Sequence, residues 1–184
     1  MRVPAEGGPP TVVLEAANNA EFRCASAAAS PDAACVLAEF EGQKMSVTSF
    51  DWRNGTRGAR QELPVQVAPG EHPNWALSPD ARAVAVTAGG AVRVMTIGAG
   101  ETWSAPASWF SGTLTGVAFR GASQLIVTTA SARENLVLLV KQAGARKIWS
   151  SPRTVSLPVI SPDGKHLLVA VTTESSNAWL VEDY

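Results

Sequence analysis

The acidic residues of this chain that share a motif are Asp32, Asp80 and Asp163, each of which directly follows a Ser-Pro pair. Brought together in space, such carboxylates would supply oxygen ligands for a divalent cation, or an acid and a base for hydrolysis. In a turn, proline fixes its own φ and aspartate hydrogen-bonds to the nearby backbone, which explains the same residues without a ligand. Since each aspartate falls in a different copy of a repeated phrase, we expect the turn role and no metal.

The two cysteines leave two alternatives open. Cys24 and Cys35 are expected on adjacent strands of one hairpin, where their Cα atoms could lie close enough for a disulfide. If residues 31–33 form the turn of that hairpin, Cys35 faces a residue near Ala29, and Cys24 lies too far along its strand. The sequence is thus compatible with a bridge between Cys24 and Cys35, and equally with two buried thiols.

Recognised catalytic and cofactor motifs do not occur in the sequence. It contains no GxSxG, HExxH, P-loop or Rossmann glycine pattern. His72 and His166, the two histidines, lie far from the cysteines, so four zinc ligands at a recognised spacing are not available. We therefore expect a protein that is not an enzyme and that uses no cofactor or metal.

Two groups of aromatic and basic residues are candidates for contact with a partner. His72 and Trp75 are expected on a loop that enters an inner strand near a central channel, and Trp52 and Arg53 lie beside an Asn-Gly turn. The alternative for His72 and Trp75 is a structural role with satisfied neighbours. The alternative for Trp52 and Arg53 is a solvated edge loop.

A turn phrase recurs along the chain and indicates its architecture. SPDGKHLLVAV begins at Ser161, and related phrases occur around Ser30, Ser78 and Arg120, the last with Arg-Gly-Ala in place of Ser-Pro-Asp. The intervals are about 48, about 42 and about 41 residues, and the last two fall in the range of one four-stranded propeller blade. After each turn, a short run of branched apolar residues without helical period predicts a strand buried on both faces.

Each full repeat is predicted to contain four short strands. In chain order they cover residues 21–26, 34–39, 44–51 and 59–65, then 74–78, 83–88, 91–97 and 101–106, then 115–120, 124–129, 135–140 and 145–150. The last repeat supplies residues 157–161, 166–173 and 177–183. Trp103 and Trp149 occupy the same position in the fourth strand of successive repeats, which predicts that both pack between neighbouring blades.

The predicted fold class is all-β, a β-propeller of four-stranded antiparallel blades with about four blades' worth of sequence. The blades are assigned to a partial blade at 1–17, full blades at 18–68, 69–109 and 110–151, and an incomplete blade at 152–184. The partial blade is interpreted as the two outer strands around a turn at Gly7 and Gly8. Pairing of residues 11–16 with 178–182 would close a four-bladed ring, but we favour a partial or open propeller, because ordinary propellers have more blades and the chain begins in mid-blade.

Composition excludes several classes of protein. With 46% hydrophobic and 17% charged residues, the chain is expected to form one globular unit. The net charge of −1 comes from interspersed signs without a basic block, so nucleic-acid binding is not expected. No apolar run reaches the roughly 18 residues of a membrane span, and the opening MRVPAEGGPP lacks the apolar stretch of a secretory signal, so we expect no direct membrane insertion.

The SPDGK turns, the blade length and the phrases RVPAEGGPP, FRCA, ACVLAE, NWALSPD and SSNAWLVEDY together resemble the TolB-like, WD-repeat-like β-propellers over nearly the whole chain. More narrowly, the chain is similar to the C-terminal propeller region of large bacterial regulators, common in acidobacteria, which join a propeller to a winged-helix DNA-binding domain or a serine/threonine kinase. The resemblance implies a membrane span between effector and propeller, a periplasmic location for this part, and missing blades or an effector domain in a longer chain. The FRGAS phrase and the long insert between Cys24 and Cys35 depart from the pattern.

The leading functional hypothesis is a non-catalytic interaction or sensor module that binds a protein or peptide partner. Rigid, radially packed sheets would hold variable loops around one face, and the loop side chains would supply specificity. Two alternatives remain open. The chain could be the propeller portion of a prolyl-oligopeptidase-like hydrolase, or a solitary TolB-like periplasmic scaffold.

Overall fold

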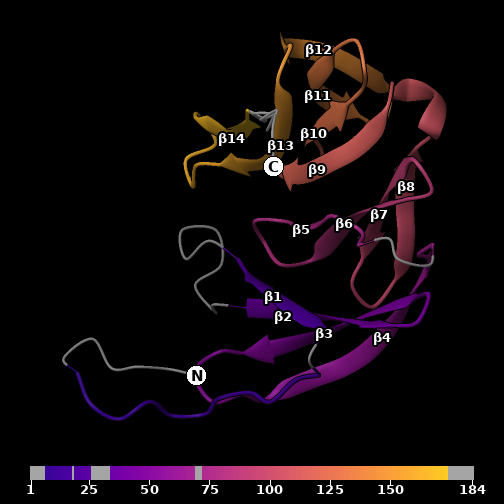
Figure 1. The fold of residues 1–184 in the computed structure, drawn as a ribbon. Coiled ribbons are helices and arrows are strands. Elements are labelled where there is room, and N and C mark those ends of the chain that lie inside the picture. Colours follow the sequence, from indigo (N-terminus) through magenta and orange to yellow (C-terminus); the bar gives the residue numbers. More distant parts are fainter. Residues whose placement is uncertain (1–6, 18, 26–33, 69–71, 174–184) are drawn as a thin grey trace, which may run out of the picture.

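The structure is a computed structural model that describes residues 7–17, 19–25, 34–68 and 72–173. These residues form three four-stranded sheets and one two-stranded sheet, in which consecutive strands pair antiparallel. The sheets fan around one side of an axis and leave the opposite side open (Figure 1). The predicted all-β fold, a partial propeller, is therefore confirmed.

Each four-stranded sheet is one blade whose strands follow one another from the concave side outward. The first blade contains β1 (Ala20–Cys24), β2 (Ala34–Glu41), β3 (Lys44–Asp51) and β4 (Arg57–Gln66). The second contains β5 (Trp75–Leu77), β6 (Ala83–Ala88), β7 (Ala91–Thr96) and β8 (Gly100–Ala105). After a short 3-10 helix, η1 (Ala107–Trp109), the third contains β9 (Thr113–Phe119), β10 (Leu125–Ala130), β11 (Asn135–Lys141) and β12 (Gly144–Ser151). The two-stranded sheet, here called the half-blade, contains β13 (Thr154–Ile160) and β14 (Leu167–Thr172).

The predicted strands of the three full repeats coincide with the observed ones to within a few residues, and β3 and β6 match at both ends. Two predictions at the chain ends have a different outcome. The strand predicted over 177–183 lies outside the described residues. Residues 1–6 of the predicted N-terminal hairpin also lie outside them, and residues 7–17 are irregular chain apart from a bridge residue at Thr11.

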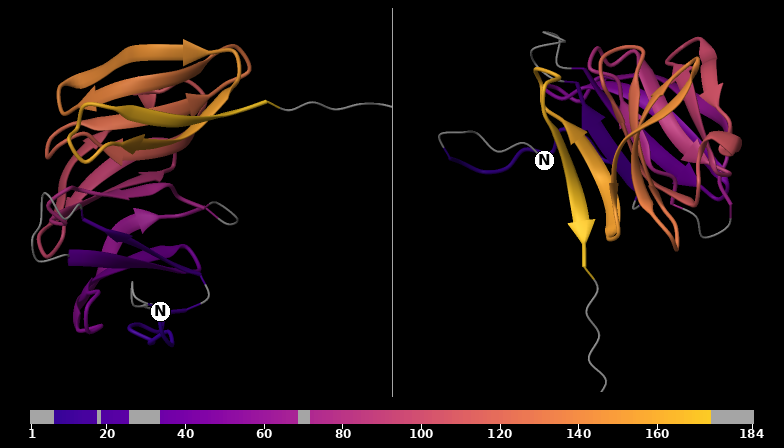
Figure 2. Two further views of the ribbon diagram at one scale, coloured as in Figure 1. Left: turned by 90° about the vertical axis from the view of Figure 1, so that its left-hand side faces the viewer. Right: turned by 90° about the horizontal axis from the view of Figure 1, so that it is seen from above.

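The hydrophobic core consists of layers between neighbouring sheets. The sheets themselves appear as a stack when the arc is viewed from its open side (Figure 2). One layer joins the first and second blades around Met45 and Trp75, and the next joins the second and third around Ala85 and Phe119. Because each middle sheet has a neighbour on both sides, β6 and β10 are buried along almost their whole length. Their Val, Ile and Thr residues suit such two-sided burial.

The third layer, between the third blade and the half-blade, is smaller. It contains Ile126, Val137, Leu139 and Val155. The Thr115 hydroxyl donates a hydrogen bond of 2.6 Å to the carbonyl of Val155. A side chain on Gly116 would collide with the ring of Pro158, so the glycine permits the close approach of the two sheets.

The two equivalent tryptophans have different environments. Trp103 on β8 packs against the layer between the second and third blades, as predicted. Trp149 on β12 is 46% exposed, which corrects the prediction that it fills the corresponding wedge. The physical reason is that the described half-blade has only inner strands, so nothing in it reaches the outer strand β12.

Candidate functional site

A groove of about 680 Å³ lies on the concave side of the arc. It is lined by the ends of the inner strands β1, β5, β9 and β13 and by the turns that follow β5, β9 and β13. All four inner strands lie at the edge of their sheet and pair on one side only. Their other edges therefore offer backbone amide and carbonyl groups toward the axis.

The turn of the second blade shows how the Ser-Pro-Asp phrase supports this groove. The buried hydroxyl of Ser78 accepts hydrogen bonds from the backbone amides of Arg82 at 3.1 Å and Ala83 at 2.8 Å, and donates one of 2.6 Å to Asp80 Oδ1. The Ser78 bond and the Arg82 amide hold the pKa of Asp80 below its usual range. The carboxylate thus stabilises the turn, as predicted from the sequence.

The turn before β14 has the same construction. Asp163 accepts hydrogen bonds from the Ser161 hydroxyl and from the Lys165 amide, which lower its pKa in the same way. The Ser161 hydroxyl also accepts a bond of 2.9 Å from the His166 amide. The turn that would contain Asp32 lies outside the described residues. Among the residues that the structure describes, no group of three or more His, Cys, Asp or Glu side chains is placed to hold a metal ion.

The third turn has Arg-Gly-Ala in place of Ser-Pro-Asp, and it is shorter. The amide of Arg120 bonds to the carbonyl of Gln124 at 2.8 Å, whereas the amide of Ser78 bonds to Ala83. One residue fewer is therefore enclosed. Gly121 adopts a positive φ of 73° in this turn, which a glycine tolerates best.

Cys24 and Cys35 lie directly opposite one another on β1 and β2 and are joined by a disulfide, with Cα atoms 4.0 Å apart. The expectation that Cys35 faces a residue near Ala29 is wrong, because the register of β1 and β2 places Cys24 opposite Cys35, and the Ala25 amide bonds to the Ala34 carbonyl beside them. The 31–33 turn on which that expectation was based lies outside the described residues. Cys24 also lines the groove.

Trp75 belongs to the core, which agrees with the structural role given above as the alternative and corrects its assignment to a partner-binding loop. It is 1% exposed, and its indole N–H donates a hydrogen bond of 2.8 Å to Glu21 Oε2. The Arg23 guanidinium lies over the ring, 4.9 Å from its centroid, and its partial burial there lowers the pKa of Arg23. Arg23 reaches the groove, so it is a candidate binding residue that the sequence analysis missed. Its position directly before a cysteine that ends an inner strand was the available signal.

The other three predicted partner-binding residues lie away from the groove. His72 is exposed ahead of β5, and its ring contacts that of Phe40 at a centroid distance of 5.5 Å. Trp52 and Arg53 follow β3, where the Arg53 guanidinium lies 5.7 Å from the Trp52 ring. The structure does not bring these residues together with Arg23.

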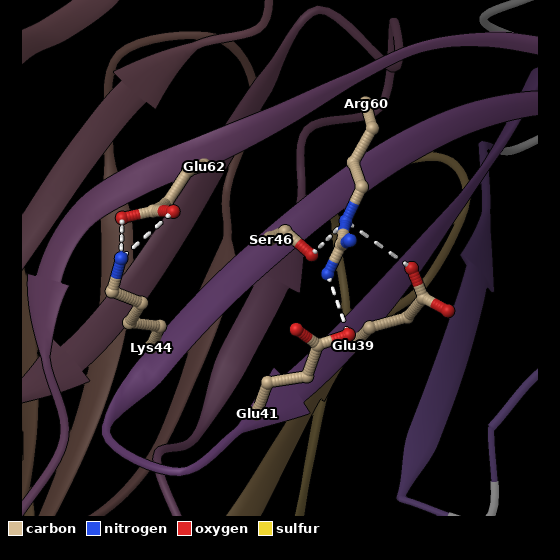
Figure 3. Close-up of polar contacts among 6 residues, drawn as sticks. All are labelled: Glu39, Glu41, Lys44, Ser46, Arg60 and Glu62. Carbon is tan, nitrogen blue, oxygen red and sulfur yellow. Dashed lines mark hydrogen bonds and ion pairs between the residues drawn. The ribbon is translucent and has the colours of Figure 1, made fainter.

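A second hollow lies among charged side chains on the outer face of the first blade (Figure 3). Its lining comes from β2, β3 and β4 and consists of Glu41, Lys44, Ser46, Arg60 and Glu62, and Glu39 lies beside Arg60. Arg60 donates to Ser46 Oγ and Glu41 Oε1, both at 2.8 Å, and lies 3.6 Å from Glu39. Lys44 pairs with Glu62 at 2.9 Å. These mostly exposed pairs link three strands and each contributes little to stability.

None of the helical structure in the described residues is long and apolar enough to cross a membrane.

The geometry defines the class of protein as an open β-propeller arc with a concave groove. No protein-family model matches the sequence, and no curated protein matches it either. A solved structure of hydrazine synthase from Kuenenia stuttgartiensis is similar at 23% identity with a TM-score of 0.53, covering 80% of this chain and 41% of that one. A structure titled as a eukaryotic initiation factor matches at 11% identity with a TM-score of 0.38, covering 84% of this chain and 49% of that one. The chain thus spans less than half of either structure, and the first likeness supports the fold alone.

Proposed function

We propose that this chain is a non-catalytic interaction module that binds a protein or peptide segment in its concave groove. The observation that carries the proposal is the convergence of four inner strand edges on one open hollow of about 680 Å³. Backbone groups at such edges can bond to an extended polypeptide, as in other modes of peptide recognition by strands. Apolar side chains such as Leu77 and Ile160 line the same groove and would contact the side chains of the bound segment.

The chemistry of the groove favours a segment that carries a carboxylate. Arg23 contributes a guanidinium, which is held by the Trp75 ring and so loses little freedom on binding. Asp163 is the acidic side chain in the lining, and its carboxylate is already bonded within its own turn. Arg23, which has Glu21 as an electrostatic neighbour on β1, is therefore the side chain of the lining that would contact an anionic group on the ligand.

The proposal includes a larger context. The resemblance to TolB-like propellers and to the propeller regions of bacterial regulators supports a role as the sensory or scaffolding part of a longer chain. A cross-strand disulfide between Cys24 and Cys35 favours an oxidising compartment such as the periplasm. In such a regulator, ligand binding would shift the equilibrium between two states of the effector domain only if the ligand's contacts with the propeller differ between those states.

Selection from a displayed library of random peptides on the immobilised chain tests the proposal. Selected peptides, labelled with a fluorophore, should bind saturably in an anisotropy titration. Arg23→Gln should weaken binding about tenfold, because a hydrogen-bonded charge is lost. Arg146→Gln, on the exposed outer strand β12, is the matched control and should have no effect. Failure to select any saturable peptide, equal sensitivity to both substitutions, or a turnover that depends on residues of this chain would overturn it.

A further inference from the structure

The disulfide of the first blade joins one accessible cysteine to one enclosed cysteine. Cys24 is exposed and lies in the lining of the groove, so it can be reached from the concave side. Cys35 is 0% exposed and packs with Leu37 and Phe50. Thiol exchange needs access to a sulfur, and exposed disulfides are the ones that exchange most readily. Cys24 is therefore the residue that an incoming thiolate would reach.

The same disulfide lies where the ladder between β1 and β2 has no backbone bonds. The Ala25 amide bonds to the Ala34 carbonyl at 3.0 Å, and bonded and non-bonded pairs alternate along an antiparallel ladder. Cys24 and Cys35, one pair further along, are consequently a non-hydrogen-bonded pair. Burial adds little here, because every residue of β1 after Ala20 is exposed. The end of β1 therefore depends on the disulfide for its position.

The position of this strand end matters to the groove, because Arg23 directly precedes Cys24. The Arg23 guanidinium lies over the ring of Trp75 in the second blade, and the Trp75 indole N–H bonds to Glu21 at 2.8 Å. Both contacts require β1 to stay beside β5. A loosened β1 would release the guanidinium from the ring and from its place in the groove lining.

We propose that the bridge between Cys24 and Cys35 is a thiol-exchange site for a dithiol, such as a reduced Cys-x-x-Cys pair, and that its reduction weakens binding in the groove. One thiolate of the dithiol attacks Cys24 Sγ and forms a mixed disulfide, while Cys35 Sγ leaves as a thiolate and takes up a proton. The second thiolate of the dithiol attacks the mixed disulfide and releases Cys24, which is also protonated. The dithiol departs as its own disulfide, so two electrons and two protons pass to the chain.

The geometry favours a dithiol over a monothiol as the reductant. After attack on Cys24, Cys35 remains directly opposite on β2 and can attack the mixed disulfide in turn, which expels a monothiol and restores the bridge. A dithiol resolves the mixed disulfide within its own molecule and so completes the reduction. Dithiothreitol should therefore open the bridge under conditions in which glutathione at equal thiol concentration leaves it closed.

Single-cysteine variants test which sulfur is reactive. Cys35→Ala leaves Cys24 and Cys24→Ala leaves Cys35, and the two variants are matched because both lack the bridge. A chromogenic aromatic disulfide should label Cys24 at least about tenfold faster than Cys35 in the folded chain, and both at similar rates in urea. Circular dichroism of both variants should remain that of a β protein. Equal rates in the folded chain, or faster labelling of Cys35, would overturn the assignment.

Hydrogen exchange of the wild-type chain measures the release of β1 without any ligand. Treatment with dithiothreitol should lower protection in β1 and leave β6 and β10 protected, because their pairing and burial do not involve the bridge. Glutathione at equal thiol concentration should leave β1 protected. Unchanged protection of β1 after complete reduction, or equal effects of the two reductants, would overturn the proposal.

The effect on the groove rests on the proposed function and is measured separately. A peptide selected on the oxidised chain should bind the reduced wild type about tenfold more weakly, the same loss as for Arg23→Gln. The Cys24→Ala, Cys35→Ala double variant is the control, which should bind with the weaker affinity and be insensitive to dithiothreitol. Equal affinities of the oxidised and reduced wild type would overturn the switch and leave the proposed function standing. A chain that selects no peptide refutes the proposed function, and hydrogen exchange then decides whether reduction releases β1.

Discussion

The middle of the arc and its two ends are built from the same repeat, yet they are stabilised differently. β10 and β14 are equivalent strands of similar apolar sequence, but β10 is buried and β14 is almost entirely exposed. At the other end, β1 is exposed along most of its length and is held by a disulfide, whereas β5 is held by burial of Trp75. The difference teaches that a strand's sequence specifies its form, and its neighbours determine what it contributes to stability.

The largest expected difference in the free energy of unfolding is between substitutions in the equivalent strands β10 and β14. Ile126→Ala should lower the free energy of unfolding by about 3 kcal/mol, because it leaves a cavity between the third blade and the half-blade. Leu168→Ala should change it by about 0.5 kcal/mol or less, because Leu168 is 69% exposed. Urea unfolding of both variants measures the contrast. Equal losses would mean that β14 is buried in the folded monomer.

Loss of the disulfide between Cys24 and Cys35 is expected to lower the free energy of unfolding nearly as much as Ile126→Ala, but to loosen only the first blade. Its removal in the Cys24→Ala, Cys35→Ala double variant should cost about 2–3 kcal/mol, from the entropy of the enclosed loop. Hydrogen exchange should show lost protection in β1 and retained protection in β6 and β10. The control is dithiothreitol, which should destabilise the wild type and leave the double variant unaffected. Uniform loss of protection would contradict a local role.

The two Ser-Pro-Asp turns give a smaller contrast. Ser78 is 2% exposed and makes three hydrogen bonds, so Ser78→Ala should cost about 1–2 kcal/mol through buried amides left without a partner. Ser161 makes similar bonds in an exposed turn, where water can replace it, and Ser161→Ala should cost about 0.5 kcal/mol. Thermal unfolding of the pair checks the order. A larger loss at Ser161 would contradict it.

The last pair of substitutions should change stability by about 1 kcal/mol or less, with opposite signs at the two turns. Ala81 has a φ of 57° at the position that Gly164 occupies with a φ of 70°. Ala81→Gly should raise stability by about 0.5 kcal/mol through relief of left-handed strain, and Gly164→Ala should lower it by about 1 kcal/mol. Differential scanning calorimetry resolves both shifts. Shifts of the same sign would show that the turns differ in backbone geometry.

Much of the fold could be predicted from local signals. The Ser-Pro-Asp turns and the branched apolar runs after them specified where strands begin, because proline, aspartate and β-branched residues act through their own backbone geometry. The same signals assigned Asp80 and Asp163 to turns, as the structure has them. The candidate site was predicted less well. Arg23 enters the groove because β1 of the first blade packs beside β5 of the second, and Trp75 on β5 is buried through the packing of the same two blades.

By itself, the sequence determined the repeat, the order of strands within each blade and the chemistry of the turns, because these depend on residues a few positions apart. Only the tertiary structure decided which equivalent residues are buried, that Cys24 faces Cys35, and that four strand edges meet at one groove. Those features depend on how one sheet packs on the next, and the same apolar residue is core or surface according to whether a neighbour is present.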